Sequence, residues 1–218
     1  MTGLDNARIL HLFANYKWTG PADPAIRTAS HLRRLGLDVV FAQARYVHPS
    51  NNHDMAQQLW NWRMPVLAGL QLRKHFHIQS LLGDVRRLRK MLRRERFDLV
   101  HCHLPGDHLL ATLACRRLSR PPVVVRSLYD PTPPRRGLRE RFALARTAGV
   151  VAPTEEVAES ITQRFRVRRD QVLVQEPVTE RPNLEGEDLR STSAAFGSAT
   201  ATGAVRSGTL RAGGWLGR

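Results

Sequence analysis

The feature that most constrains this sequence is a repeated alternation between short apolar runs and longer segments with helical periodicity. The first run, 8–14, is closed by polar, Gly and Pro residues, as expected of a strand buried in a parallel sheet. Further strands are expected at 37–42, 97–103, 122–126, 148–152 and 171–174, and helices at 26–35, 78–96, 105–118, 138–145 and after an N-cap at Thr154. This alternation predicts an α/β fold, a Rossmann-like open parallel sheet with helices on both faces.

The first helix has a clear apolar side and a clear end. Ile26, Ala29, Leu32 and Leu35 recur at helical spacing, and Gly36 is placed to stop the helix. The strand, loop, helix and strand that open the chain therefore fit a right-handed crossover between two parallel strands.

A strongly basic face is expected on the helix that covers 78–96, opposite the side that carries its apolar residues, which are Ile78, Leu81, Leu82, Val85, Leu88 and Leu92. The preceding stretch, 45–77, is rich in Trp and other apolar residues but has no clean periodicity. Such a basic face is usually a solvated surface, and the alternative is docking to anionic lipid. The candidate membrane contacts are Arg86, Arg89, Lys90 and Arg93.

The composition is basic, with 34 Lys and Arg against 19 Asp and Glu and a formal net charge of +15. Membrane surfaces, nucleic acid and phosphorylated substrates are candidate partners, but specific nucleic-acid binding is not expected because the known recognition motifs are lacking. Two cysteines, Cys102 and Cys115, are too few for a disulfide framework. Without a signal peptide or an apolar run of about 18 residues, we expect a cytoplasmic protein, with peripheral contact at the inner membrane face as an open alternative.

The sequence changes character after residue 181. Of the 37 residues in 182–218, 21 are Gly, Ala, Ser or Thr, and long apolar side chains are few. Such a segment cannot bury enough surface to offset the entropy lost on ordering, so we expect a folded domain over 1–181 and a disordered, low-complexity tail over 182–218. The tail fits either a frameshifted or truncated reading frame or an ordinary linker.

Two histidines are expected on one face of the strand at 97–103. His101 and His103 alternate along it and point the same way, whereas Cys102 points to the opposite face. A metal site would need further ligands, and the nearest histidine in sequence is His108, so no metal site is expected.

Several motifs, taken in order, resemble the family-four retaining glycosyltransferases of the GT-B class. They are the loop 16–22 with the helix and turn that end at 33–39, the strand end Phe97–Pro105 (FDLVHCHLP), the segment 150–155 (VVAPTE) and the segment 172–178 (VLVQEPV). Each motif is weak by itself, and the specificity lies in their order and spacing over residues 8–180.

This resemblance implies two facing Rossmann-like domains, of which this chain would be the N-terminal, acceptor-side one. The partners implied are a nucleotide sugar and a sugar or lipid-linked acceptor, with no metal or other cofactor. His103 would be the catalytic-site residue that meets the transferred sugar. The substrate-binding candidates, near the carboxyl ends of the strands, are Thr19, Gly20, Arg126, Tyr129 and Asp130.

One departure from the family pattern affects the expected activity. The Glu-x7-Glu pair of the donor-binding domain is absent from this sequence. We therefore expect a truncated enzyme whose isolated chain is inactive. The alternatives are a non-catalytic basic module that binds anionic membrane or nucleic acid, and the remnant of a broken gene.

Overall fold

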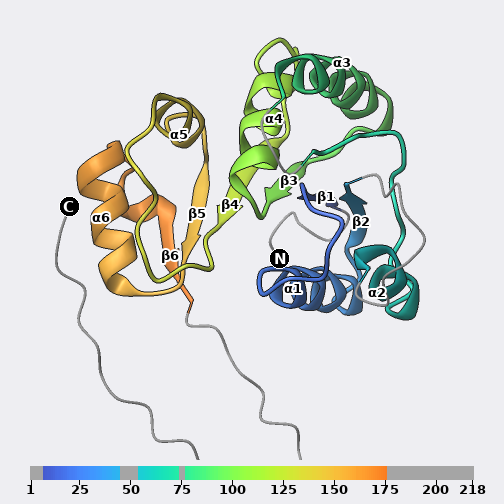
Figure 1. Cartoon of the computed structure of the whole chain (residues 1–218), viewed down its shortest axis with the longest axis horizontal. Coiled ribbons are helices and arrows are strands. Elements are labelled where there is room, and N and C mark those ends of the chain that lie inside the picture. The colour runs from blue at the N-terminus through green and yellow to red at the C-terminus, as the bar shows by residue number, and fades with distance from the viewer. Residues whose placement is uncertain (1–6, 45–53, 74–76, 176–218) are drawn as a thin grey trace, which may run out of the picture. The chain divides into compact units, whose positions relative to one another are not determined.

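The computed structural model describes residues 7–44, 54–73 and 77–175 and contains one six-stranded, fully parallel sheet with the strand order β2-β1-β3-β4-β5-β6 (Figure 1). The strands are β1 (Arg8–Phe13), β2 (Asp38–Gln43), β3 (Leu99–Cys102), β4 (Val123–Ser127), β5 (Gly149–Ala152) and β6 (Val172–Val174). The helices are α1 (Ala22–Arg34), α2 (Met55–Asn61), α3 (Ile78–Glu95), α4 (Pro105–Cys115), α5 (Leu138–Leu144) and α6 (Glu155–Phe165). The predicted Rossmann-like α/β fold is confirmed.

Helices cover both faces of the sheet because the strands alternate their apolar side chains between them. On one face, Leu10 and Leu12 of β1 pack in a cluster with Leu88 of α3 and Leu110 of α4. On the other face, the neighbouring β1 residues pack with α1 and α2, through Ile9, Phe13, Ile26, Met55 and Leu59. Figure 1 shows α1 and α2 on the side of the sheet opposite α3 and α4.

The helix α6 begins and packs as its sequence predicts. The Thr154 hydroxyl accepts a hydrogen bond from the Val157 backbone N–H at 3.3 Å, which caps the first turn. Val157, Ile161 and Phe165 are buried in a third cluster with residues of β5 and β6.

Three apolar residues that the helical pattern placed on packed sides are exposed. Leu35 follows the last residue of α1 and is 66% exposed, since it serves as the C-cap rather than as part of the helix. Ile78 and Leu82 of α3 are 61% and 51% exposed, because only a narrower stripe of that helix, with Val85 and Leu88 in it, meets the sheet. The helix α4 ends at Cys115, three residues before the predicted 118.

The stretch without clear periodicity contains α2 and an irregular segment beside the edge strand β2. The backbone N–H of Phe41 donates to the Pro65 carbonyl, and the N–H of Leu67 donates to the Phe41 carbonyl, both at 2.8 Å. One short helix and one strand-like contact leave no single period in the sequence. The segments 45–53, 74–76 and 176–218, including the predicted tail and the boundary at 181, lie outside the described residues.

The helices that follow β1 and β3 lie on opposite faces of the sheet, and this arrangement determines where a ligand can bind. The connection from β1 to β2 passes through α1 on one face, whereas that from β3 to β4 passes through α4 on the other. In open α/β sheets, ligands bind beyond the carboxyl ends of the strands at such a switch point. A ligand site is therefore expected at the carboxyl ends of β1 and β3. None of the described helices is both long enough and apolar enough to cross a bilayer.

Candidate functional site

A cleft of about 910 Å³ lies at the carboxyl ends of β1, β3 and β4. Its walls include Ala14 just after β1, His103 and Leu104 just after β3, and Tyr129 just after β4. Its volume is within the range of small-molecule binding sites. The cleft therefore occupies the position that the sheet topology predicts for a ligand.

Both signs of charge line the cleft, but one basic side chain differs from the others in burial. The charged residues of the wall are Arg73, Arg126, Arg135, Arg139, Asp84, Asp130 and Glu140. Arg126 is only 4% exposed, whereas the other arginines of the wall are exposed. Burial raises the pKa of the half-buried Glu140, and the positive charge of Arg126 partly opposes this shift.

Arg126 meets a buried carboxylate, Asp107, in the first turn of α4. Its Nη1 lies 3.4 Å from Oδ1 of Asp107. The same carboxylate accepts backbone N–H groups from Leu104 at 2.9 Å, Ala14 at 3.3 Å and His103 at 3.4 Å. Burial raises the pKa of Asp107 to about 7, although Arg126 and these N–H donors oppose the rise.

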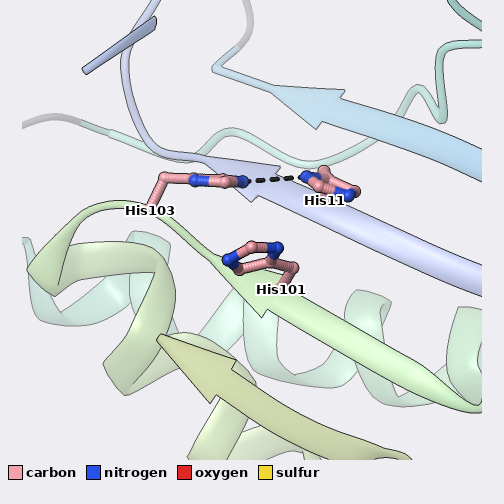
Figure 2. Close-up of side chains that lie close together, drawn as sticks. All are labelled: His11, His101 and His103. Carbon is pink, nitrogen blue, oxygen red and sulfur yellow. Dashed lines mark hydrogen bonds between the residues drawn. The ribbon is translucent and has the colours of Figure 1, made fainter. Parts of the chain in front are cut away.

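Three buried histidines, His11, His101 and His103, lie close together, as Figure 2 shows, and His103 lines the cleft. His11 of β1 is the register partner of His101 of β3, and the ring centroids of His101 and His103 are 4.4 Å apart. Nδ1 of His11 and Nε2 of His103 share a hydrogen bond of 2.9 Å. The outer nitrogens of His101 and His103 are hydrogen-bonded to Ser127 Oγ at 2.7 Å and to the Tyr129 hydroxyl at 2.6 Å.

Burial keeps all three imidazoles neutral at pH 7. It lowers the pKa of His101 to about 4 and that of His11 and His103 well below the ordinary value. Neighbouring charges lower each pKa further: Arg126 acts on His101 and His103, and His101 acts on His11. At neutral pH these imidazoles can therefore donate or accept hydrogen bonds. They carry no imidazolium proton, so they cannot act as general acids.

The same three residues could hold a metal ion, since one nitrogen from each lies within 4.8 Å of the others. A metal would have to displace the hydrogen bond between His11 and His103, and the positive charge near Arg126 would oppose its binding. His108, the histidine nearest in sequence to the predicted pair, is hydrogen-bonded to Thr147 Oγ1 at 2.6 Å instead.

Sequence reasoning missed His11 as a member of this cluster. The alternation of Ile9, His11 and Phe13 in β1 could have shown which face His11 occupies. Its closeness to His101 depends on β1 and β3 being neighbours, although 90 residues separate the two histidines. The predicted pairing of His101 with His103 on one face is confirmed.

The predicted substrate-binding residues occupy different parts of the cleft region. Arg126, Tyr129 and Asp130 all line the cleft, and Asp130 Oδ1 also accepts the Thr132 backbone N–H at 2.7 Å. Thr19 and Gly20 are not in its wall, although the next residue, Pro21, is. Gly20 is exposed and has open space where a side chain would lie.

The predicted membrane contacts divide into two groups on α3. Arg86, Lys90 and Arg93 are exposed. Arg89 is half-buried and donates to the backbone carbonyls of Leu113 and Ala114, at 3.0 Å and 3.1 Å, near the end of α4. A cation at a helix C-terminus stabilises the last carbonyls, so Arg89 joins α3 to α4.

The parallel sheet, its helices on both faces and the cleft at the switch point define one Rossmann-like half of the GT-B glycosyltransferase fold. The sequence profile of Glycosyltransferase Family 4 matches residues 24–177, and the chain belongs to this family. The resemblance drawn from the motifs is thereby confirmed.

Solved structures share this fold. A glycosyltransferase from Rickettsia africae ESF-5 is 14% identical with a TM-score of 0.60, over 79% of this chain and 43% of its own. Anabaena Alr3699/HepE in complex with UDP is 15% identical with a TM-score of 0.57, and the match covers 78% of this chain and 43% of that one. A UDP-GlcNAc 2-epimerase from Neisseria meningitidis, bound to UDP-GlcNAc, is 16% identical with a TM-score of 0.57, and the match covers 77% of this chain and 45% of that one.

These likenesses show the fold alone, because epimerases match as well as transferases. This chain spans less than half of each structure named above. Comparison with curated proteins gives no significant match.

Proposed function

We propose that this chain is the acceptor-side domain of a nucleotide-sugar-dependent glycosyltransferase and that the cleft holds the acceptor. The observation that carries the proposal is the position of the cleft, at the carboxyl ends of β1, β3 and β4 in a domain of Glycosyltransferase Family 4. UDP or UDP-glucose is present in structures of similar fold, which supports a nucleotide sugar as the donor of the complete enzyme.

His103 is proposed as the residue that meets the transferred sugar, because it borders the cleft just beyond β3. Both of its ring nitrogens are hydrogen-bonded, to His11 and to Tyr129. A hydrogen bond from His103 to a sugar hydroxyl therefore requires the Tyr129 hydroxyl to move away from Nδ1. Since its imidazole is neutral, His103 would orient the sugar rather than protonate it.

The other proposed contacts lie around the cleft. Arg126, Tyr129 and Asp130 would bind the acceptor, since all three belong to the cleft wall. Thr19 and Gly20 would approach the donor or a sugar hydroxyl through the backbone, because Gly20 is exposed and carries no side chain beside the half-buried Thr19. The chain by itself is expected to have negligible transferase activity, since the donor-binding Glu-x7-Glu pair is absent from its sequence.

Ligand-observed NMR on the full chain tests this proposal. A panel of sugar and lipid-linked sugar acceptors is compared with UDP-glucose as the donor probe. We expect at least one acceptor to bind and Tyr129→Ala to weaken it at least fivefold, whereas Arg164→Gln, on an exposed face of α6, leaves it unchanged. Binding of UDP-glucose with no acceptor bound, or turnover of UDP-glucose by this chain alone, would contradict the proposed role.

A further inference from the structure

Arg126 is a buried cation whose hydrogen-bonding capacity is largely unused. Among the described residues, its side chain makes one hydrogen bond, from Nη1 to Asp107 at 3.4 Å, and its Nε has no partner. The side chain borders the cleft although the residue is only 4% exposed. A guanidinium has five N–H donors, and leaving them unpaired in a buried site is unfavourable.

The carboxylate of Asp107 only partly compensates the positive charge of the Arg126 guanidinium. Its carboxylate is engaged by the backbone N–H groups of Leu104, Ala14 and His103 as well as by Arg126. Burial also raises its pKa to about 7, so near neutral pH the carboxyl carries only part of a negative charge. In the described part of the chain, no other carboxylate lies within 4 Å of the Arg126 guanidinium.

The N-terminus of α4 lies in the same wall of the cleft. This helix has 11 residues, and its first two, Pro105 and Gly106, line the cleft beside Leu104. Pro105 has no N–H, so Gly106 is the first residue of this helix that has one to offer, and the helix dipole makes this end attractive to anions. The buried guanidinium and the helix N-terminus thus present positive potential to one cavity.

We infer that Arg126 and the N-terminus of α4 form an anion subsite that takes a phosphate or carboxylate group of the acceptor. This inference rests on the proposed function, because it names the chemical class of the molecule held in the cleft. A planar guanidinium matches both groups through paired hydrogen bonds.

The exposed basic residues of the wall favour an anionic ligand, although Asp130 and Glu140 also line it. Arg73 and Arg135 are exposed at the cleft and add long-range attraction. Of the acidic residues there, Asp84 is already bound to Arg87 and to the backbone N–H of Leu72. With a neutral sugar in the cleft, Asp107 would remain the only carboxylate beside the Arg126 guanidinium among the described residues.

Isothermal titration of the full chain with inorganic phosphate and with acetate tests the subsite, in chloride buffer at constant ionic strength. We expect one phosphate or acetate to bind per chain. The variant is Arg126→Gln combined with Asp107→Asn, which removes both buried charges and so avoids leaving one of them unpaired. Its affinity is expected to fall at least tenfold, whereas Arg135→Gln, at the exposed side of the cleft, changes it less than threefold.

Circular dichroism of each variant verifies the fold, and Arg126→Lys, which keeps the charge without the planar fork, should give intermediate affinity. Equal binding by wild type and double variant, or no binding of either anion to the wild type, overturns the inference. In that case neutral acceptors that still bind in the NMR panel would leave the proposed function standing. Binding of phosphate but not acetate, or the reverse, identifies which acidic group the subsite takes.

Discussion

The rings of His11 and His103 are joined by a hydrogen bond of 2.9 Å between Nδ1 and Nε2, which links the first and third strands of the sheet (Figure 2). From the other side of His103, a hydrogen bond of 2.6 Å continues to the Tyr129 hydroxyl at the cleft. A chain of neutral groups therefore connects the packed face of the sheet to the candidate site. His11 is fully buried, so it orders His103 without touching a ligand.

Replacement of His11 by Ala should destabilise the domain by roughly 2–4 kcal/mol, because it opens a cavity and leaves Nε2 of His103 without its partner. Urea unfolding at pH 7.5 measures this change. The matched control is His31→Ala on an exposed position of α1, which should shift stability by less than about 0.5 kcal/mol. Equal effects of the two substitutions would show that the His11–His103 contact does not stabilise the fold.

The parts of this structure that depend on local pattern could be predicted from the sequence. The six strands, the cap at Thr154 and the shared face of His101 and His103 follow from alternation and capping, which act over a few residues. That His11 belongs to the cluster with His101 and His103 could not be predicted in this way. Such a prediction requires the strand order, which is set by packing of the whole sheet.

The same distinction applies to Arg126. Its place near the strand ends follows from the pattern of β4, but its burial and its contact with Asp107 depend on where α4 begins relative to that strand. The sequence alone indicated a basic residue at the edge of a site. The structure adds that its charge is buried and only partly compensated.

The buried histidines should make the domain unstable in acid. Burial lowers the pKa of His108 from 6.5 to about 3 and that of His101 to about 4, and His11 and His103 shift in the same direction. The unfolded chain therefore binds more protons than the folded one below pH 6.5, so stability is present above that pH and is lost as the pH falls toward 4.

Asp107 acts in the opposite direction, because its pKa rises from 3.8 to about 7 on folding and its contribution is lost as the pH rises through that range. Burial also raises the pKa of Glu140, but the four histidines outnumber these two carboxyls, so net stability should fall between pH 7 and pH 5. His108→Gln should reduce this fall by ~2 kcal/mol in urea unfolding. An unchanged pH dependence in His108→Gln would show that His108 is not held neutral by folding, and the exposed His31→Gln is the control.

The cluster of His11, His101 and His103 is expected to bind no transition metal tightly, despite its convergent nitrogens. Two of these nitrogens are hydrogen-bonded to each other, and a divalent ion would add charge near Arg126. Titration with Co²⁺ at pH 7.5, followed by visible absorption, measures this directly. A one-to-one complex with intense tetrahedral absorption, abolished by His11→Ala, would contradict the expectation and assign a metal site.

The exposed basic residues of α3 form either a membrane-docking surface or an ordinary solvated one, and binding to vesicles distinguishes the two. If α3 docks, full-length chain should co-sediment with vesicles that contain anionic lipid, and binding should weaken with added salt. Combined replacement of Arg86, Lys90 and Arg93 by Gln should then weaken binding roughly a hundredfold, at about 1 kcal/mol for each charge. Arg89→Gln should instead lower stability, because Arg89 is bound to α4 carbonyls.

The control for this triple variant carries the same change of net charge at exposed positions outside α3, in Arg141→Gln, Arg146→Gln and Arg164→Gln. Equal losses in both triple variants would indicate attraction by net charge alone, and equal binding to neutral vesicles would exclude docking through this basic face.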